Sequence, residues 1–145
     1  MIKSYRGKLA DGDKNTISLH TNDGKTGYTI KKISLINSNP GDVDYSAVVK
    51  VYSIPQTTVD NNIDFEDSTL LAAGYISTDA SSTQFPEDLA IVFDNVTINQ
   101  DIFVTCKQTG ASDVDSCNYY IELEQVSLTE DQALVAIVKN LRNEQ

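Results

Sequence analysis

The acidic stretch from residue 60 to 67, DNNIDFED, holds the side chains whose spacing comes closest to a metal site. Asp60, Asn62 and Asp64 have the spacing of the first oxygen ligands in a calcium-binding loop. Phe65 stands where such a loop needs glycine for its sharp turn, and Leu71 stands where a bidentate glutamate would complete the coordination. The stretch therefore predicts a solvated acidic loop, with calcium binding as the alternative.

The two cysteines and the single histidine are the other candidates for chemistry. Cys106 and Cys117 lie in two strands that we predict to form one hairpin. In each strand the cysteine alternates in step with the apolar residues, so both cysteines are expected on the same, apolar face. Two small buried side chains are expected there, with a cross-strand disulfide as the alternative. A metal site is disfavoured, because two thiols make an incomplete ligand set. His20 falls on the polar parity of its strand, so we expect it to point outward with nothing nearby to orient it as a base.

The sequence contains no nucleophile elbow, phosphate loop, dinucleotide fingerprint or zinc spacing, so we predict a protein that is not an enzyme and needs no cofactor. The net charge of -10 argues against binding to nucleic acid or to an anionic membrane surface. No apolar run approaches the length of a membrane span, and the start, MIKSYRGK, has no apolar signal-peptide core. Folding in a cytoplasm is therefore expected.

Short runs of alternating apolar and polar residues, separated by turn sequences, predict about eight strands. They are expected near residues 4–9, 16–20, 27–37, 45–53, 69–76, 89–93, 102–106 and 117–126. The apolar parity changes within the third run, which predicts a β-bulge near Lys31 and Lys32. The stretch from 99 to 126 predicts a long hairpin that organises the fold. Residues 1–128 therefore predict an all-β domain, a single antiparallel β-sandwich that is jelly-roll-like.

The strand expected near residues 69–76 carries apolar residues on both faces. A strand that is buried on one side only needs one apolar face. The face formed by Leu70, Ala72 and Ile76 is therefore expected to meet either another subunit or a covering loop.

Residues 129–145 change to a helical period and predict a short C-terminal amphipathic helix with a tail. The apolar face of this helix consists of Leu134, Ile137, Val138 and Leu141. Thr129, followed three residues later by Gln132, is typical of a capping box. Because so short a helix is marginal by itself, its apolar face must dock. Docking on its own sandwich and docking on a neighbouring subunit are both open at this point.

Five segments carry a resemblance to a known group of proteins. They are residues 18–33 (SLHTNDGKTGYTIKKI), 50–74 (KVYSIPQTTVDNNIDFEDSTLLAAG), 93–105 (FDNVTINQDIFVT), 117–128 (CNYYIELEQVSL) and 139–143 (KNLRN). Through these segments, which follow one another over most of the sequence, the chain resembles small virion structural proteins of marine tailed phages, especially those that infect cyanobacteria. The resemblance implies a virion component, assembled in the host cytoplasm, rather than a reaction.

The expected role is a capsid decoration, or cement, protein that stabilises the head by protein–protein contact. Its partners would be the major capsid protein or other virion proteins, and a homo-oligomer, with a trimer favoured, would match the local axes of a shell. The contact surface would be the face of Leu70, Ala72 and Ile76 or the terminal helix. The alternatives are a neck, tail or baseplate component and a calcium-dependent glycan-binding β-sandwich.

Overall fold

The computed structural model describes residues 1–39, 45–78, 87–93, 96–109 and 116–143 of the chain, without the side chains of residues 78, 87–88 and 140–143. These segments form eight strands and one helix. The elements are β1 (Ile2–Leu9), β2 (Lys14–Ile17), β3 (Thr26–Asn37), β4 (Tyr45–Tyr52), β5 (Leu70–Thr78), β6 (Glu87–Val92), β7 (Ile102–Gln108), β8 (Cys117–Ser127) and α1 (Glu130–Asn143).

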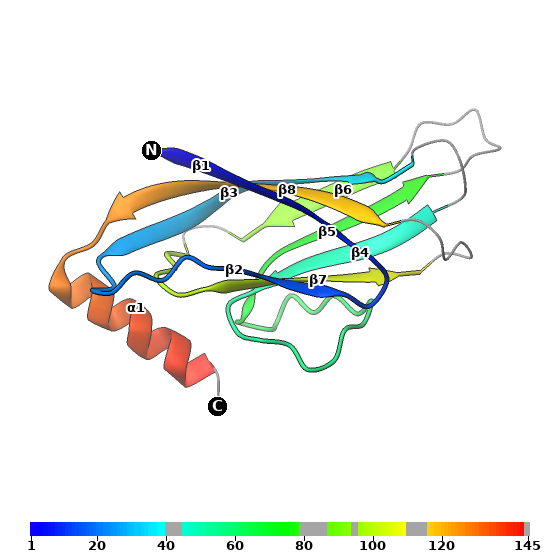
Figure 1. The fold of residues 1–145 in the computed structure, drawn as a ribbon. Coiled ribbons are helices and arrows are strands. Elements are labelled where there is room, and N and C mark those ends of the chain that lie inside the picture. The colour runs from blue at the N-terminus through cyan, green and yellow to red at the C-terminus, as the bar shows by residue number, and fades with distance from the viewer. Residues whose placement is uncertain (40–44, 79–86, 94–95, 110–115, 144–145) are drawn as a thin grey trace.

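The strands form two antiparallel sheets that pack face to face (Figure 1). One sheet has the order β1-β8-β3 and the other has the order β2-β7-β4-β5-β6. β1 pairs with β8, β2 pairs with β7 and β4 pairs with β5, while β3 lies against β6. This nesting of strands from the two halves of the chain is the jelly-roll arrangement, so the predicted fold class is confirmed. The two sheets are unequal because β6 hydrogen-bonds to β5 instead of β3.

The hairpin predicted between residues 99 and 126 is wrong. β7 lies in the five-stranded sheet, whereas β8 is the central strand of the other sheet, between β1 and β3. Both strands turn their apolar residues towards one shared core from opposite sides, including Ile102 and Val104 in β7 and Ile121 and Leu123 in β8. Alternation identifies the buried face of a strand, but not the strand beside it. The residues that join the two strands, 110–115, lie outside the described residues.

The predicted bulge in β3 is confirmed. The pairing of β3 with β8 changes register between Ile30 and Lys32. Tyr28 and Ile30 before the shift, and Ile33 and Leu35 after it, are all buried in the core. One extra residue therefore turns two sets of opposite parity towards the same side, as a β-bulge does.

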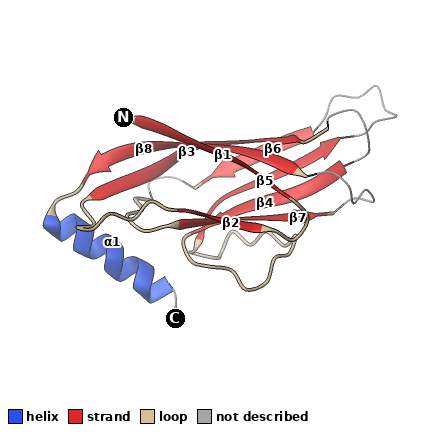
Figure 2. Ribbon diagram, viewed as in Figure 1, coloured by secondary structure: helices blue, strands red, loops and turns tan. Residues whose placement is uncertain are grey.

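Two segments outside the sheets complete the fold (Figure 2). The long connection between β4 and β5 lies on the side of the five-stranded sheet that faces away from the other sheet (Figure 1). α1 lies at one end of the sandwich, near the turn that precedes β3. The helix and this connection are the places where the sequence predicted contact surfaces or a metal site.

Candidate functional site

The helix α1 begins with the capping box that the sequence predicts. Thr129 Oγ1 accepts a hydrogen bond from the backbone N–H of Gln132 at 3.2 Å, and Gln132 Oε1 accepts one from the backbone N–H of Thr129 at 3.0 Å. The two side chains satisfy backbone donors that the first turn of a helix leaves free. They also set the direction in which the helix leaves β8.

The helix docks on its own chain through Ala133 and Ile137. Ala133 is buried, and a Cβ placed on Gly24 would lie 3.3 Å from Ile137 Cδ1. Gly24 has a φ of 66°, in the region that favours glycine, so the turn before β3 can pass directly beneath the helix. Of the two docking modes that the sequence left open, the structure contains the one on its own sandwich.

Asn99 joins the helix to this turn by hydrogen bonds. Its Nδ2 donates to the carbonyl of Gly24 at 3.0 Å and to the carbonyl of Ala133 at 3.2 Å, and the side chain is only 1% exposed. Sequence reasoning missed this residue, because an asparagine before a strand is typical of an ordinary turn. Asn99 therefore acts as a clamp between three segments that are distant in sequence.

Three other apolar residues of α1 are largely exposed to solvent. Leu134 is 61% exposed, Val135 is 61% exposed and Val138 is 46% exposed. We call these three residues the helix stripe. The predicted apolar face is therefore split: Ile137 packs inward, Leu134 and Val138 point outward, and the side chain of Leu141 lies outside the described residues. Val135 was not predicted, because its position falls beside the expected face.

The surface predicted at Leu70, Ala72 and Ile76 is corrected by the structure. These side chains are 4%, 0% and 3% exposed, so they are buried within the chain itself. Ala72 and Ile76 belong to the core between the two sheets. Leu70 is paired with Tyr52 at the edge of the connection between β4 and β5. Ala72 and Ile76 are thus covered by the other sheet, not by a subunit or a loop, and it is Ala73 and Tyr75 on the opposite face of β5 that lie beside Ile63 and Phe65 of the connection.

A buried lysine holds that connection to the sheet. The side chain of Lys50, in β4, is 3% exposed, and its ammonium donates to Asp60 Oδ1 at 2.8 Å and to the carbonyl of Asn62 at 2.6 Å. It also lies 5.5 Å from the centre of the Tyr52 ring. Burial is the largest single influence on the pKa of Lys50 and by itself would lower it, but the hydrogen bonds and charge interactions with Asp60 and Tyr52 together outweigh burial and the pKa is raised. The hydrogen bond from Lys50 correspondingly lowers the pKa of Asp60.

The calcium interpretation of Asp60, Asn62 and Asp64 does not fit this arrangement. The Lys50 ammonium already binds Asp60 Oδ1, the first oxygen of the expected ligand set, together with the backbone carbonyl of Asn62. Asp64 instead accepts a hydrogen bond from the backbone N–H of Glu66 at 2.9 Å. Within the described part of the chain, no three His, Cys, Asp or Glu side chains gather as a metal site would require. The positive charge beside this loop is therefore the ammonium group of Lys50.

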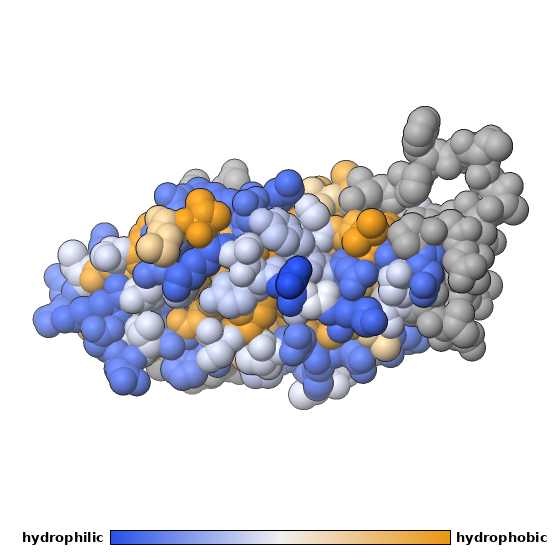
Figure 3. Space-filling view, turned by 45° about the horizontal axis from the view of Figure 1, so that its top comes forward, coloured by the Kyte–Doolittle hydropathy of each residue, from blue (hydrophilic) through white to orange (hydrophobic). Residues whose placement is uncertain are grey.

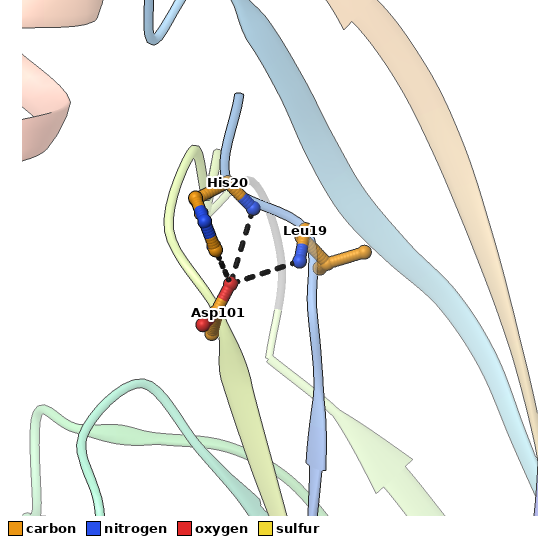
Figure 4. Close-up of polar contacts among 3 residues, drawn as sticks. All are labelled: Leu19, His20 and Asp101. Atoms are coloured by element: carbon orange, nitrogen blue, oxygen red, sulfur yellow. Dashed lines mark hydrogen bonds and ion pairs between the residues drawn. The ribbon is translucent and has the colours of Figure 1, made fainter. Parts of the chain in front are cut away.

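His20 points outward, as predicted, but Asp101 orients it, which the sequence analysis did not anticipate (Figure 4). Its Nδ1 lies 2.6 Å from Asp101 Oδ1. The same oxygen accepts the backbone N–H groups of Leu19 and His20 at 3.0 and 3.1 Å. Burial raises the pKa of Asp101, but the hydrogen bonds from His20 and the two backbone groups outweigh it, and the pKa is lowered. Asp101 lies more than eighty positions from His20, so no local pattern reveals the pair.

The pair has the geometry of a base and the carboxylate that orients it. The His20 side chain is 57% exposed, however, and the linings of five hollows on the described surface contain neither His20 nor Asp101. No hydrogen bond joins the other ring nitrogen to a hydroxyl or thiol of the described residues. The arrangement by itself therefore ties the chain after β2 to the start of β7.

Cys106 and Cys117 form no disulfide, and both are fully buried. They face one another from the two sheets, next to the buried Tyr45, instead of lying across one hairpin. A hydrogen bond from Cys117 lowers the pKa of Cys106, while burial opposes the shift. The prediction of two small buried side chains is confirmed by these positions.

A second group of exposed apolar side chains lies on and beside β6. It consists of Ile63, Phe65, Leu89 and Ile91. The Phe65 ring meets Phe93 edge to face, with 5.0 Å between ring centres.

Of the helices in the described chain, none is long and apolar enough to cross a membrane. No family model and no curated protein matches the sequence.

Proposed function

We propose that this protein is a non-enzymatic structural component of a tailed-phage virion and that it acts as a capsid decoration, or cement, protein. Two lines support the proposal. Segments over most of the sequence resemble small virion structural proteins of marine tailed phages. The jelly roll also presents apolar side chains to solvent at places where its own chain does not use them.

The observation that carries the proposal is the helix stripe. Ala133, Ile137 and Asn99 already fix α1 to its own chain. Leu134, Val135 and Val138 are therefore held outward on a positioned helix, and they contribute nothing to the core. Exposed apolar side chains on an ordered element are typical of a surface that binds another protein.

In this role the protein binds preformed shell as a homo-oligomer, with a trimer matching a local symmetry axis, and its stripe contacts the major capsid protein or a second copy. Each contact is small, but many copies bind to one particle. Binding to the assembled shell and not to its separated subunits stabilises the shell by mass action. No bond is made or broken, and no cofactor is needed.

The experiment is quantitative mass spectrometry of purified virions, followed by add-back to particles that lack the protein. Decoration predicts a copy number comparable to that of the major capsid protein. Leu134→Asp and Val138→Asp should leave the melting temperature of the isolated chain nearly unchanged and abolish saturation of the particles.

Ile137→Asp is the matched control, because it places the same charge on the inward face of the same helix. It should lower the melting temperature of the isolated chain. A copy number of only a few per particle would contradict decoration and favour a neck, tail or baseplate component. Normal binding of the Leu134→Asp variant would show that the stripe is not the contact surface.

A further inference from the structure

The outer face of the three-stranded sheet carries a hollow of about 600 Å³ that has no assigned role. Its shape follows from the pairing of the strands. Asn118, in the central strand β8, is short, and its cross-strand neighbours on the two sides are the longer Lys8 in β1 and Ile36 in β3. Tyr120, the next residue of β8 on this face, has Arg6 and Ser34 as its neighbours. The floor is therefore low at Asn118 and rises towards both edge strands and towards the Tyr120 ring.

Charge is distributed unevenly around this hollow. The chain has a net charge of -10, yet two cations, Arg6 and Lys8, line the hollow and no carboxylate does. The two glutamates of β8 on this face, Glu122 and Glu124, lie further along the strand, and Glu124 is paired with Lys31 at 3.1 Å. Glu122 is the diagonal cross-strand neighbour of Arg6, beyond the Tyr120 end of the hollow, whereas the strand neighbours of Lys8 on this face carry no carboxylate.

Arg6 and Lys8 also differ from the lysines that serve the fold. Lys25, Lys31, Lys50 and Lys107 each pair with a carboxylate of the chain. Within the described residues, no ion pair or side-chain hydrogen bond involves Arg6 or Lys8, and both are exposed. Neither charge is therefore paired with a carboxylate of the residues that the structure describes.

The opposite side of the hollow is apolar and aromatic. Ile36 is 56% exposed and Tyr120 is 37% exposed. Figure 3 turns this sheet towards the viewer and shows a largely hydrophilic face interrupted by separate hydrophobic patches. A ligand that fits must therefore offer negative charge on one side and apolar surface on the other.

We propose that this hollow binds an acidic protein segment, with its carboxylates on Arg6 and Lys8 and an adjacent apolar side chain on Ile36 and Tyr120. Guanidinium and ammonium groups both donate hydrogen bonds to carboxylates. An acidic glycan would offer carboxylates too, but a sugar site favours an open aromatic platform, and the neighbouring Tyr119 is buried. The exposed isoleucine favours a peptide. A protein partner is expected here because of the contact role proposed above, and the inference rests on the proposed function in this respect alone.

The test uses the full chain and a fluorescein-labelled peptide of alternating glutamate and leucine, measured by fluorescence anisotropy. The wild-type chain should bind it, and affinity should fall as salt is raised. Arg6→Glu and Lys8→Glu should each weaken binding about tenfold, because each replaces an attraction with a repulsion. Arg6→Lys, which keeps the charge, should bind nearly as well as the wild type. Both positions are exposed, so these variants should keep the wild-type melting temperature.

Lys139→Glu is the control, because it makes the same change of net charge on α1, far from the hollow. It should bind as the wild type does. Equal weakening by Lys139→Glu would overturn the proposal by showing an effect of net charge alone, as would wild-type binding by Arg6→Glu. Binding of oligogalacturonate in place of the peptide would also overturn it. If the peptide does not bind, the copy number expected for a decoration protein on the virion is unaffected. Either proposal can therefore fail without the other.

Discussion

Replacement of Asp60 by alanine tests whether the buried Lys50 ammonium needs its carboxylate partner. The ammonium has two hydrogen-bond acceptors in the structure, Asp60 Oδ1 and the carbonyl of Asn62. Asp60→Ala removes the charged acceptor and leaves a cation that is 3% exposed with one neutral partner. The connection between β4 and β5 should then loosen, because Lys50 is its ionic attachment to the sheet.

The expected cost follows from the unequal exposure of the two partners. Loss of one partner from a fully buried ion pair costs about 3–5 kcal/mol. Asp60 is 57% exposed, so water can partly replace it, and we expect about 2 kcal/mol. For a chain of this size that lowers the melting temperature by about 8 °C. Thermal and urea unfolding followed by circular dichroism would measure both quantities.

The pH dependence of the loss has a definite sign. The pKa of Asp60 is lowered in the folded chain, so its stabilising effect is present above the unfolded value of about 3.9 and is lost as the pH falls through the folded value. The difference between the wild type and Asp60→Ala should therefore be constant near neutral pH and should shrink below about pH 4.

Asp64→Ala is the matched control in the same loop, because Asp64 accepts only a local backbone hydrogen bond. It should cost about 0.5 kcal/mol. The double variant Lys50→Met, Asp60→Ala should recover much of the stability, since it removes the buried charge together with its partner. Millimolar calcium should leave every melting temperature unchanged. Equal losses for Asp60→Ala and Asp64→Ala would refute the reasoning, and so would a calcium-dependent rise that both variants abolish.

Three further substitutions test other contacts. Asn99→Ala removes both hydrogen bonds of the clamp, so it should cost about 2 kcal/mol and increase amide hydrogen exchange in α1 selectively. Gly7→Ala would place a Cβ 2.6 Å from the Tyr119 hydroxyl, and we expect a cost of about 1–3 kcal/mol in urea unfolding. Asp101→Asn should cost about 1 kcal/mol at neutral pH. Because the pKa of Asp101 is lowered, that cost should be present above pH 4 and vanish in acid, as measured by melting curves over a pH series that also follow the His20 ring by NMR.

Each of these three has its own contradicting result. Uniform exchange across the chain in Asn99→Ala would mean that the helix is not a separate unit. Unchanged stability of Gly7→Ala would mean that the Tyr119 ring can move aside without cost. A loss in Asp101→Asn that stays constant down to pH 3 would assign the effect to hydrogen bonds that do not depend on the charge.

The sequence by itself determined the features that depend on residues a few positions apart. Alternation identified most of the strands, and the change of parity near Lys31 located the bulge. Thr129 and Gln132 marked the start of the helix, because a capping box is made within one turn. Inward Tyr119 and outward Tyr120 also follow from alternation alone.

Only the tertiary structure decided which distant segments meet. Alternation could not place β7 and β8 in different sheets, because either pairing buries the same faces. Lys50 lies on the strand face opposite to the core residues Val49 and Val51. It is buried because a loop that begins after the strand ends folds back over it. The pairing of Asp101 with His20 and the outward turn of the helix stripe depend in the same way on how strands far apart in the chain are packed. The contacts that test the function of this protein therefore come from its tertiary packing, whereas its class of fold could be predicted from the periodicity of its residues.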